Sequence, residues 1–218
     1  MRIFFSLVIV LALAASFGAC KSGSGSATFC DTACLKDSLK FTKNEHPLKP
    51  YVYINAKNCA PDTITWSYEG AESNRKIGFA YLLREGIKLN KDFTRCFIAD
   101  TTQAWLLFND CATGRGYQIK LPFNKKKSMN ANSSSLNNLD KKFAVADELV
   151  VYSDKGNLFV EDMVSGKKAM MTFGKKLEID YDNIHATIDS INVTPTNVWA
   201  KVMIDGEWKQ LEKKISLQ

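Results

Sequence analysis

Histidine is scarce in this chain: only His46 and His185 occur among its 218 residues. Neither belongs to an H-E-x-x-H metal-binding motif, and the sequence also lacks a G-x-S-x-G nucleophile elbow, a phosphate-binding loop and a dinucleotide fingerprint. His46 precedes Pro47 in a segment typical of an extended connector, and His185 lies in an alternating stretch, 184–188, that predicts a strand. Both histidines are therefore interpreted as structural or surface residues, and no catalytic residue is assigned.

Long apolar runs are also missing, with one exception at the start of the chain. Residues 3–15 are almost wholly apolar and follow Arg2, and Gly18 and Ala19 lead into Cys20. A short positive start, an apolar core of this length and small residues at its end are typical of a secretory signal, and the core is shorter than a membrane-spanning helix requires. The sequence thus predicts a signal helix at 1–19 that is removed on export.

The small residues before Cys20 make this signal resemble the lipobox of bacterial lipoproteins, although Phe17 stands where an aliphatic residue is usual. The resemblance covers only residues 1–20. It implies cleavage before Cys20 and acylation of that cysteine with fatty acids such as palmitate. Several acyl chains would hold the protein on a membrane, so the lipid bilayer of a bacterial cell envelope is the implied partner. The alternative is an ordinary secretory signal with Cys20 as a structural cysteine.

Residues 20–28 contain no acidic side chain and form a tether rich in Gly and Ser. No acidic sorting signal therefore follows Cys20, and the outer membrane is favoured over the inner one. Residues 29–218 are expected to form a single domain, because 45% hydrophobic and 24% charged residues are ordinary for a globular protein. Lysine pairs scattered along the chain supply much of the net charge of +6, which favours solvated turns and strand edges over a nucleic-acid site.

The cysteines beyond the signal are odd in number: Cys30, Cys34, Cys59, Cys96 and Cys111. At least one thiol is therefore expected to stay free or to pair outside the chain. Export permits disulfides, but the sequence does not assign the pairs. If Cys96 and Cys111 flank a hairpin with its tip near Thr101, they lie roughly 13 Å out of register, which argues against a bridge between them. Cys30 and Cys34 have no matching pair at metal spacing, so no zinc site is expected.

A turn motif repeats along the chain. The pattern D-x-x-[ST]-G occurs at 110–114 and, 52 residues later, at 162–166, with apolar runs before both copies at the same offset. Another group of turn-forming residues, at 58–62, lies 52 residues before the first copy. Asp205 and Gly206 mark a shorter fourth copy. Apolar residues alternate beside these turns, as at Ile64 and Trp66. About four hairpin units are therefore predicted across 29–218.

This pattern predicts an all-β fold built as an antiparallel meander. In the third unit, strands are expected near 148–153, 157–162 and 167–173. Strands joined by D-x-x-[ST]-G resemble the outer strands of β-propeller blades, and this resemblance, over 41–214, implies a propeller-like arrangement of the units. A β-sandwich or an open barrel stays an alternative, because the same hairpins can stack or curl.

Two stretches depart from the strand pattern. Residues 73–89 predict either a helix between Ser73 and Gly86 or a buried strand over 77–83. Residues 128–139 are polar and of low complexity, and they are predicted to form an exposed loop between the second and third units.

Aromatic side chains are candidates for a binding surface. Tyr51, Tyr53, Trp66 and Tyr68 belong to one predicted hairpin. If exposed, they would stack on sugar rings or on a protein partner; if buried, they would form the core of that unit, which is the favoured interpretation.

The tripeptide Asp-[Ser/Thr]-[apolar or Thr] recurs more often than composition predicts. It resembles an O-glycosylation sequon of exported proteins in some Gram-negative bacteria, which implies glycans on Thr32, Ser38, Thr63, Thr101 and Ser190. The alternative is that these dipeptides serve turns and helix caps.

Carboxylates are plentiful, and the pair that a glycosidase needs would meet only in space. Asp180 and Asp182 lack the Gly and Glu of a calcium-binding EF-hand loop and are interpreted as part of a turn, so no metal or cofactor is expected. The sequence favours a membrane-anchored envelope lipoprotein whose β domain binds a protein or a carbohydrate, or helps to assemble an envelope complex. An envelope hydrolase that uses paired carboxylates is the alternative.

Overall fold

The computed structural model describes residues 28–83 and 86–218. Runs of alternating apolar and polar residues form strands there, because a strand places successive side chains on opposite faces. In β14 (Asn197–Ile204), the buried side chains are Val198, Ala200, Val202 and Ile204, and the residues between them are partly exposed. The predicted all-β class is confirmed: helical turns in the described residues are limited to α2 (Phe79–Leu82), η1 (Lys91–Phe93) and η2 (Ile184–Ala186).

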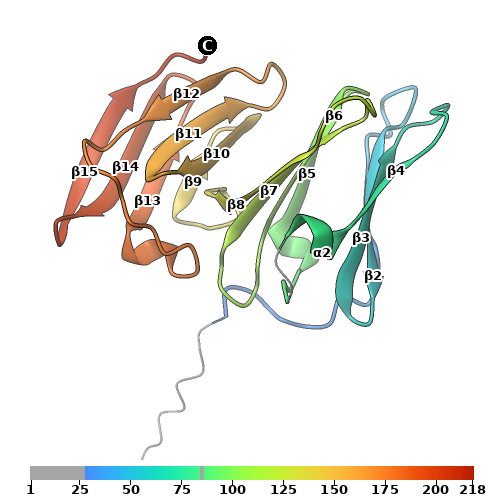
Figure 1. Cartoon of the computed structure of the whole chain (residues 1–218), viewed down its shortest axis with the longest axis horizontal. Helices are drawn as coiled ribbons and strands as arrows, with labels where there is room; N and C mark the ends of the chain where they lie inside the picture. Colours follow the sequence, from blue (N-terminus) through green and yellow to red (C-terminus); the bar gives the residue numbers. More distant parts are fainter. Residues whose placement is uncertain (1–27, 84–85) are drawn as a thin grey trace, which may run out of the picture.

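The described strands form three sheets (Figure 1). The first sheet has the order β1-β2-β3-β4 and contains β1 (Leu39–Thr42), β2 (Tyr51–Lys57), β3 (Ala60–Ser67) and β4 (Arg75–Gly78). The second has the order β12-β11-β10-β8-β7-β6-β5 and contains β5 (Thr94–Ala99), β6 (Gln103–Asn109), β7 (Gly116–Pro122), β8 (Asn130–Ser135), β10 (Leu149–Asp154), β11 (Asn157–Asp162) and β12 (Lys168–Met171). The third has the order β15-β14-β13-β9, in which β9 (Phe143–Val145) runs parallel to β13 (Ile188–Val193) and β15 (Glu207–Lys214) is the outer strand.

One of the smaller sheets packs on each end of the seven-stranded sheet. Strands β5–β7, here called the N-terminal arm, pack against the first sheet through a core that includes Trp66 and Phe108. Strands β10–β12, here called the C-terminal arm, pack against the third sheet through a second core that includes Val160 and Val202. The two cores explain why one chain of hairpins forms two sandwiched halves.

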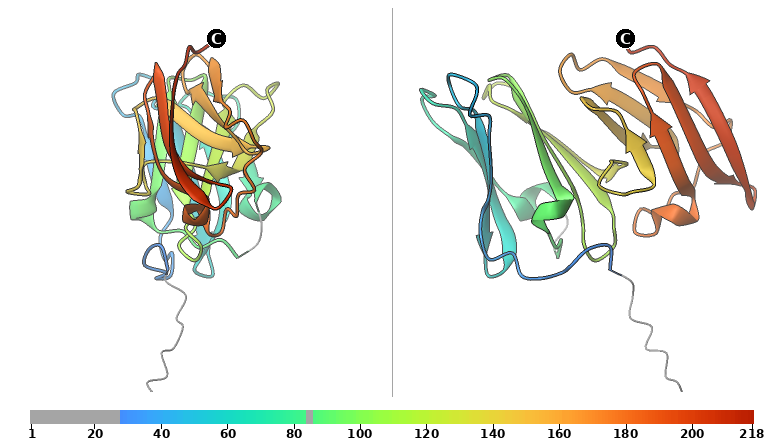
Figure 2. Two further views of the ribbon diagram at one scale, coloured as in Figure 1. Left: turned by 90° about the vertical axis from the view of Figure 1, so that its left-hand side faces the viewer. Right: turned by 180° about the vertical axis from the view of Figure 1, so that it is seen from behind.

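The seven-stranded sheet bends at β8, so that the other faces of the two arms turn toward each other (Figure 2). Trp105 and Leu107 of the N-terminal arm pack against Val150 and Met163 of the C-terminal half. The indole Nε1 of Trp105 donates a hydrogen bond to the Met163 carbonyl at 3.0 Å. The layers therefore follow in the order first sheet, N-terminal arm, C-terminal arm and third sheet, and the space between the arms is here called the crease.

The repeated motif forms the same turn in both arms. In each copy the glycine N–H donates to the carbonyl of the leading aspartate, at 2.7 Å for Asp110 and 2.9 Å for Asp162. Each aspartate carboxylate also accepts a hydrogen bond from the hydroxyl three residues later, Thr113 or Ser165, at 2.8 Å in both turns. The hairpin units are therefore present, but the propeller arrangement is not confirmed, because the second and third units share one sheet.

The prediction of an exposed loop at 128–139 is wrong. Strand β8 lies in this stretch and joins the two arms, and Ser134, Ser135 and Asn137 are buried. These polar side chains find partners inside the fold: the Ser134 hydroxyl donates to the Ser153 carbonyl, and the side-chain Oδ1 of Asn137 accepts from the Leu139 N–H at 3.1 Å. A polar composition therefore does not exclude burial where the neighbouring strands supply hydrogen bonds.

Two further local predictions need correction. Residues 73–89 form neither one long helix nor one buried strand, since β4 ends at Gly78 and the single turn of α2 follows at once. His185 does not lie in a strand, because Ile184–Ala186 is a short helical turn and β13 begins only at Ile188.

The predictions of an unpaired cysteine and of no bridge between Cys96 and Cys111 agree with the structure. Disulfides join Cys30 to Cys111 and Cys34 to Cys59, and Cys96 is the free thiol among the described cysteines. Cys96 lies opposite Leu106 in the β5–β6 hairpin, so a bridge to Cys111 is ruled out by register as expected.

The helical turns in the described part of the chain are each too short to span a bilayer.

Candidate binding site in the crease

The crease holds a cavity of about 410 Å³. One wall comes from β5 and β6 and includes Phe97 and Leu107. The opposite wall comes from segments 135–138 and 145–151, together with Met163. Because Phe97, Leu107, Val150 and Met163 pack on Trp105, the floor of this cavity is apolar. A cavity of this volume with an apolar floor fits a group of side-chain or sugar size.

Three hydrogen bonds of the Met163 backbone hold the floor in place. The Met163 carbonyl accepts from Trp105 Nε1 at 3.0 Å and from the side-chain amide of Gln103 at 2.5 Å. The Met163 N–H donates to the Glu148 carbonyl at 2.7 Å. Glu148 has a φ of 62°, which non-glycine residues rarely adopt. The tertiary contacts of the 162–166 turn therefore fix a strained backbone at the mouth of the cavity.

A buried charge cluster ties the arms together behind the floor. Glu161 of β11 has a side chain only 5% exposed, and its carboxylate lies 3.0 Å from the ammonium groups of both Lys120 and Lys168. The Lys120 ammonium lies 4.9 Å from the ring centre of Trp105. Since Lys120 belongs to the N-terminal arm and Lys168 to the C-terminal arm, Glu161 bridges the two. A paired and hydrogen-bonded buried charge of this kind fixes the relative position of the arms.

The rim of the cavity is polar and charged. Arg95 stands on the N-terminal side, and Asp147, Glu148 and Asn138 stand on the opposite side, all of them exposed. Both carboxylates that line the cavity therefore come from consecutive residues of one wall. A glycosidase needs two carboxylates that flank the scissile bond, so the arrangement in the crease fits binding better than glycoside hydrolysis.

The free thiol is not a reactive nucleophile. Cys96 borders the crease, but its side chain packs with the core of the N-terminal half. Burial raises the pKa of Cys96 to about 12. The thiol is therefore protonated at neutral pH, whereas nucleophilic cysteines need an accessible thiolate.

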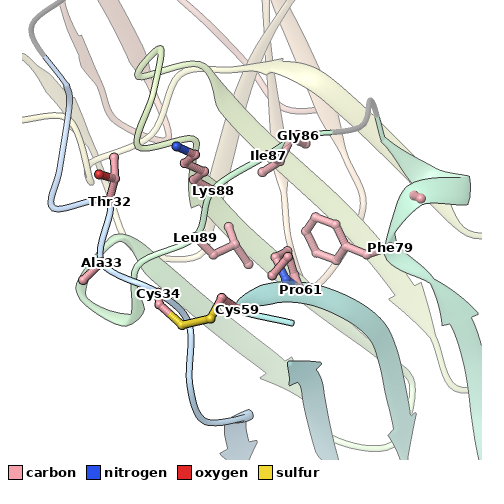
Figure 3. A pocket seen from close by; sticks show the side chains of 12 residues that line it. Thr32, Ala33, Cys34, Cys59, Pro61, Phe79, Gly86, Ile87, Lys88 and Leu89 are labelled. Atoms are coloured by element: carbon pink, nitrogen blue, oxygen red, sulfur yellow. A yellow bond between two sulfur atoms is a disulfide. The ribbon is translucent and has the colours of Figure 1, made fainter. Parts of the chain in front are cut away.

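A second hollow of about 390 Å³ lies where the N-terminal segment crosses the first sheet (Figure 3). The Cys34–Cys59 disulfide borders it, and the side chains of Phe79, Pro61 and Leu89 lie around it. Lys88 is the only charged residue among those described in its lining. The crease therefore offers the richer set of polar groups for recognition.

Two carboxylates outside the crease, those of Asp189 and Asp180, serve the fold. Asp189 lies 3.1 Å from the ammonium of Lys142 and 3.2 Å from that of Lys201, and these hydrogen bonds lower its pKa to about 2. The Asp180 carboxylate accepts a hydrogen bond from the Asp182 N–H at 3.0 Å, which agrees with its predicted place in a turn. No cluster of three or more His, Cys, Asp or Glu side chains that could hold a metal ion occurs in the described part of the chain.

The proposed aromatic surface is not a single surface. Trp66 is 1% exposed and donates from its indole Nε1 to the Pro122 carbonyl at 2.9 Å. Tyr68 packs edge-on against Phe123. Tyr51 and Tyr53, in contrast, stack on each other at 4.5 Å and stay partly exposed. Tyr68 is partly exposed too, but it packs against the core of the N-terminal half, so the stacked Tyr51–Tyr53 pair forms the aromatic contact surface of this hairpin.

The sites predicted for modification differ in accessibility. Thr32 is exposed, and Ser38, Thr101 and Ser190 are partly exposed. Thr63 is 7% exposed and donates its hydroxyl proton to Asp62. Glycosylation stays a prediction at the first four positions, and burial makes Thr63 the least accessible of the set. Lipidation of Cys20 stays a prediction as well, because that residue lies outside the described part of the chain.

Sequence reasoning missed the crease, because its walls come from strands far apart along the chain. The one sequence feature that pointed toward the crease was the repeated D-x-x-[ST]-G turn, because its second copy, 162–166, contains the lining residue Met163. Comparison of the chain with models of known protein families and with curated proteins finds no match.

Proposed function

We propose that this protein is exported, is anchored to a bacterial envelope membrane through acylated Cys20, and binds a partner protein or carbohydrate in the crease. The observation that carries the proposal is the cavity of about 410 Å³ between two arms, with an apolar floor and a charged rim. Ligand sites are typically concave and mostly apolar, with a few polar groups that orient the ligand.

The two disulfides support the location. Cys30–Cys111 and Cys34–Cys59 use four of the five cysteines that would remain after lipidation. Disulfides persist in oxidising compartments and are rare in the cytosol. Both bridges also tie the segment that follows the tether to the domain, so the pull of a membrane anchor would pass into the β6–β7 turn at Cys111.

The anchor is tested by metabolic labelling with a clickable palmitate analogue. We expect labelled protein in the membrane fraction for the native chain and unlabelled protein for Cys20→Ala. Label that persists in Cys20→Ala, or a native protein without label, would contradict lipidation at this residue.

Binding in the crease is tested by site-specific photo-crosslinking in cells. A benzoylphenylalanine residue replaces Asn138 at the crease rim, and a control carries it at Tyr81, which is 89% exposed and belongs to α2. We expect a discrete adduct from position 138 and none of that mass from position 81. Equal labelling from both positions, or no adduct from position 138, would argue against a partner in the crease.

A further inference from the structure

Strand β5 is the last strand at one end of the seven-stranded sheet. It pairs with β6 from Thr94 to Ala99, and no other described strand lies on its outer side. An unpaired strand edge presents a row of backbone donors and acceptors that another extended chain can use. Proteins usually protect such free edges against pairing with another chain.

The backbone of Cys96 faces outward at this edge. The Thr94 N–H donates to the Lys91 carbonyl, outside the β5–β6 ladder. The Ile98 carbonyl accepts from the Lys43 ammonium at 3.4 Å, also outside that ladder. Backbone groups of alternate residues point to the same side of a strand, so Cys96, midway between these two, directs its N–H and carbonyl outward as well. No hydrogen bond outside the ladder reaches the Cys96 backbone from any described residue.

Hollows flank β5 on both faces of the sheet. The crease cavity, on one face, is lined by Phe97. A second hollow of about 500 Å³ lies between β1 and β5 and is mixed in character: Phe41 and Ile98 line it together with Lys40, Lys43 and Glu45. A strand added beside β5 would direct successive side chains to opposite faces, and therefore alternately into these two hollows.

Two other outer strands are guarded against such pairing. The edge of β12 is closed by the C-terminus, because Lys168 and Gln218 exchange backbone hydrogen bonds of 3.0 and 3.1 Å. Strand β15, Glu207–Lys214, has the sequence EWKQLEKK and is exposed along most of its length. Alternating charge of this kind is a common defence of strand edges. In β5, TRCFIA, Arg95 is the only charged residue, and it forms no salt bridge with a described residue.

We propose that the outer edge of β5 binds an extended segment of a partner protein as an eighth strand, hydrogen-bonded to the backbone of Cys96. The segment has apolar side chains at alternating positions, which enter the crease, polar side chains between them, which enter the hollow between β1 and β5, and an acidic residue opposite Arg95. Cross-strand pairs of opposite charge stabilise neighbouring strands, and strand addition is an established mode of peptide recognition. This inference rests on the proposed binding function and names the class of partner.

The test uses a library of random decapeptides displayed on a carrier and panned on the full-length protein purified in detergent. Selected peptides are then measured on the native protein, on Cys96→Pro and on the matched control Cys96→Ala. Proline lacks the N–H that the added strand would use, yet it is tolerated at edge positions whose N–H faces solvent. We expect alternating apolar residues in the selected peptides, near-native affinity for Cys96→Ala, and about tenfold or greater loss for Cys96→Pro.

Peptides that bind Cys96→Pro as tightly as Cys96→Ala would overturn strand addition, and so would a selection that enriches nothing above the carrier. Because a proline can also perturb folding, amide hydrogen exchange on the native protein supplies an independent readout. Exchange at Cys96 is expected to slow about tenfold or more when a selected peptide is bound, and unchanged exchange would overturn the proposal. An in-cell adduct at position 138 that survives Cys96→Pro would leave binding in the crease intact while removing strand addition at β5.

Discussion

The imidazole Nε2 of His185 lies 2.8 Å from the carboxylate of Asp140. The other ring nitrogen, Nδ1, lies 3.2 Å from the carbonyl oxygens of both Ile188 and Asp189. Both nitrogens therefore face acceptors, which favours the doubly protonated imidazolium. The pair joins the segment before β9 to the start of β13, and with no acceptor nitrogen left over it acts as a structural clamp and not as a general base.

This clamp predicts a pH window of stability. The hydrogen bond to Asp140 raises the pKa of His185 above 6.5. Burial alone would raise the pKa of Asp140, but hydrogen bonds from His185 and Lys142 outweigh it and lower that pKa below 3.8. The histidine contribution is complete below pH 6.5 and is lost as the pH rises through the folded-state pKa. The aspartate contribution is complete above pH 3.8 and is lost as the pH falls through the folded-state pKa.

We therefore expect His185→Gln to lower the free energy of unfolding by about 1 kcal/mol between about pH 4 and 6.5. The difference from the native protein should shrink as the pH rises through the folded-state pKa of His185, which lies above 6.5. Urea unfolding across this range is the measurement, and a deficit that grows with pH would contradict the imidazolium assignment.

The ion pairs of Glu161 with Lys120 and Lys168 predict that loss of this one carboxylate charge lowers the stability of the protein. Glu161→Gln leaves two lysines beside each other without their counter-charge, so we expect a loss of about 2 kcal/mol in the free energy of unfolding. Glu69, whose side chain is 57% exposed, pairs with Lys49 at 3.0 Å and supplies the control. Glu69→Gln should change the same quantity by less than about 0.5 kcal/mol. Equal effects of the two substitutions would show that Glu161 does not carry the contact between the arms.

The backbone at Gly116, where the two arms join, leaves no space for a side chain. A Cβ added to Gly116 would lie 2.1 Å from the Ser135 carbonyl oxygen, which belongs to the backbone of β8 and cannot move aside easily. We expect Gly116→Ala to lower the free energy of unfolding by about 2–3 kcal/mol. Gly206 has a φ of 80° but open space around it, so Gly206→Ala should cost only about 1 kcal/mol of backbone strain. Thermal unfolding of both variants distinguishes these values, and the reverse order would refute the close approach at β8.

The two disulfides predict a ranked loss of stability. Cys30–Cys111 closes a sequence separation of 81 residues, and Cys34–Cys59 closes one of 25. In the chain-entropy model, the longer loop contributes about 4.5 kcal/mol and the shorter about 3.5 kcal/mol. Replacing each pair by serines should therefore destabilise the protein more for Cys30 and Cys111, as measured by urea unfolding. The Cys96→Ser variant is the control, since it removes no bridge.

Much of the local structure could be predicted from the sequence. Alternation in β3 and β14, and turns such as Asp205-Gly206, are set by side chains a few residues apart, and the structure confirms them. The odd cysteine followed from counting, and the register argument against a Cys96–Cys111 bridge followed from hairpin geometry. These features depend on short-range chemistry, which one sequence contains in full.

The tertiary structure alone decided how the hairpins assemble. The polar stretch 128–139 became a central strand because Val151 and Ser153 of β10 offer backbone carbonyls to it, at Leu136 and Ser134. The crease exists because the sheet bends there and brings Trp105 to Met163. Local periodicity states which side of a strand is apolar, but not which distant surface that side will meet. The strands and turns could therefore be predicted from the sequence, whereas the candidate site is formed only by packing between residues far apart in the chain.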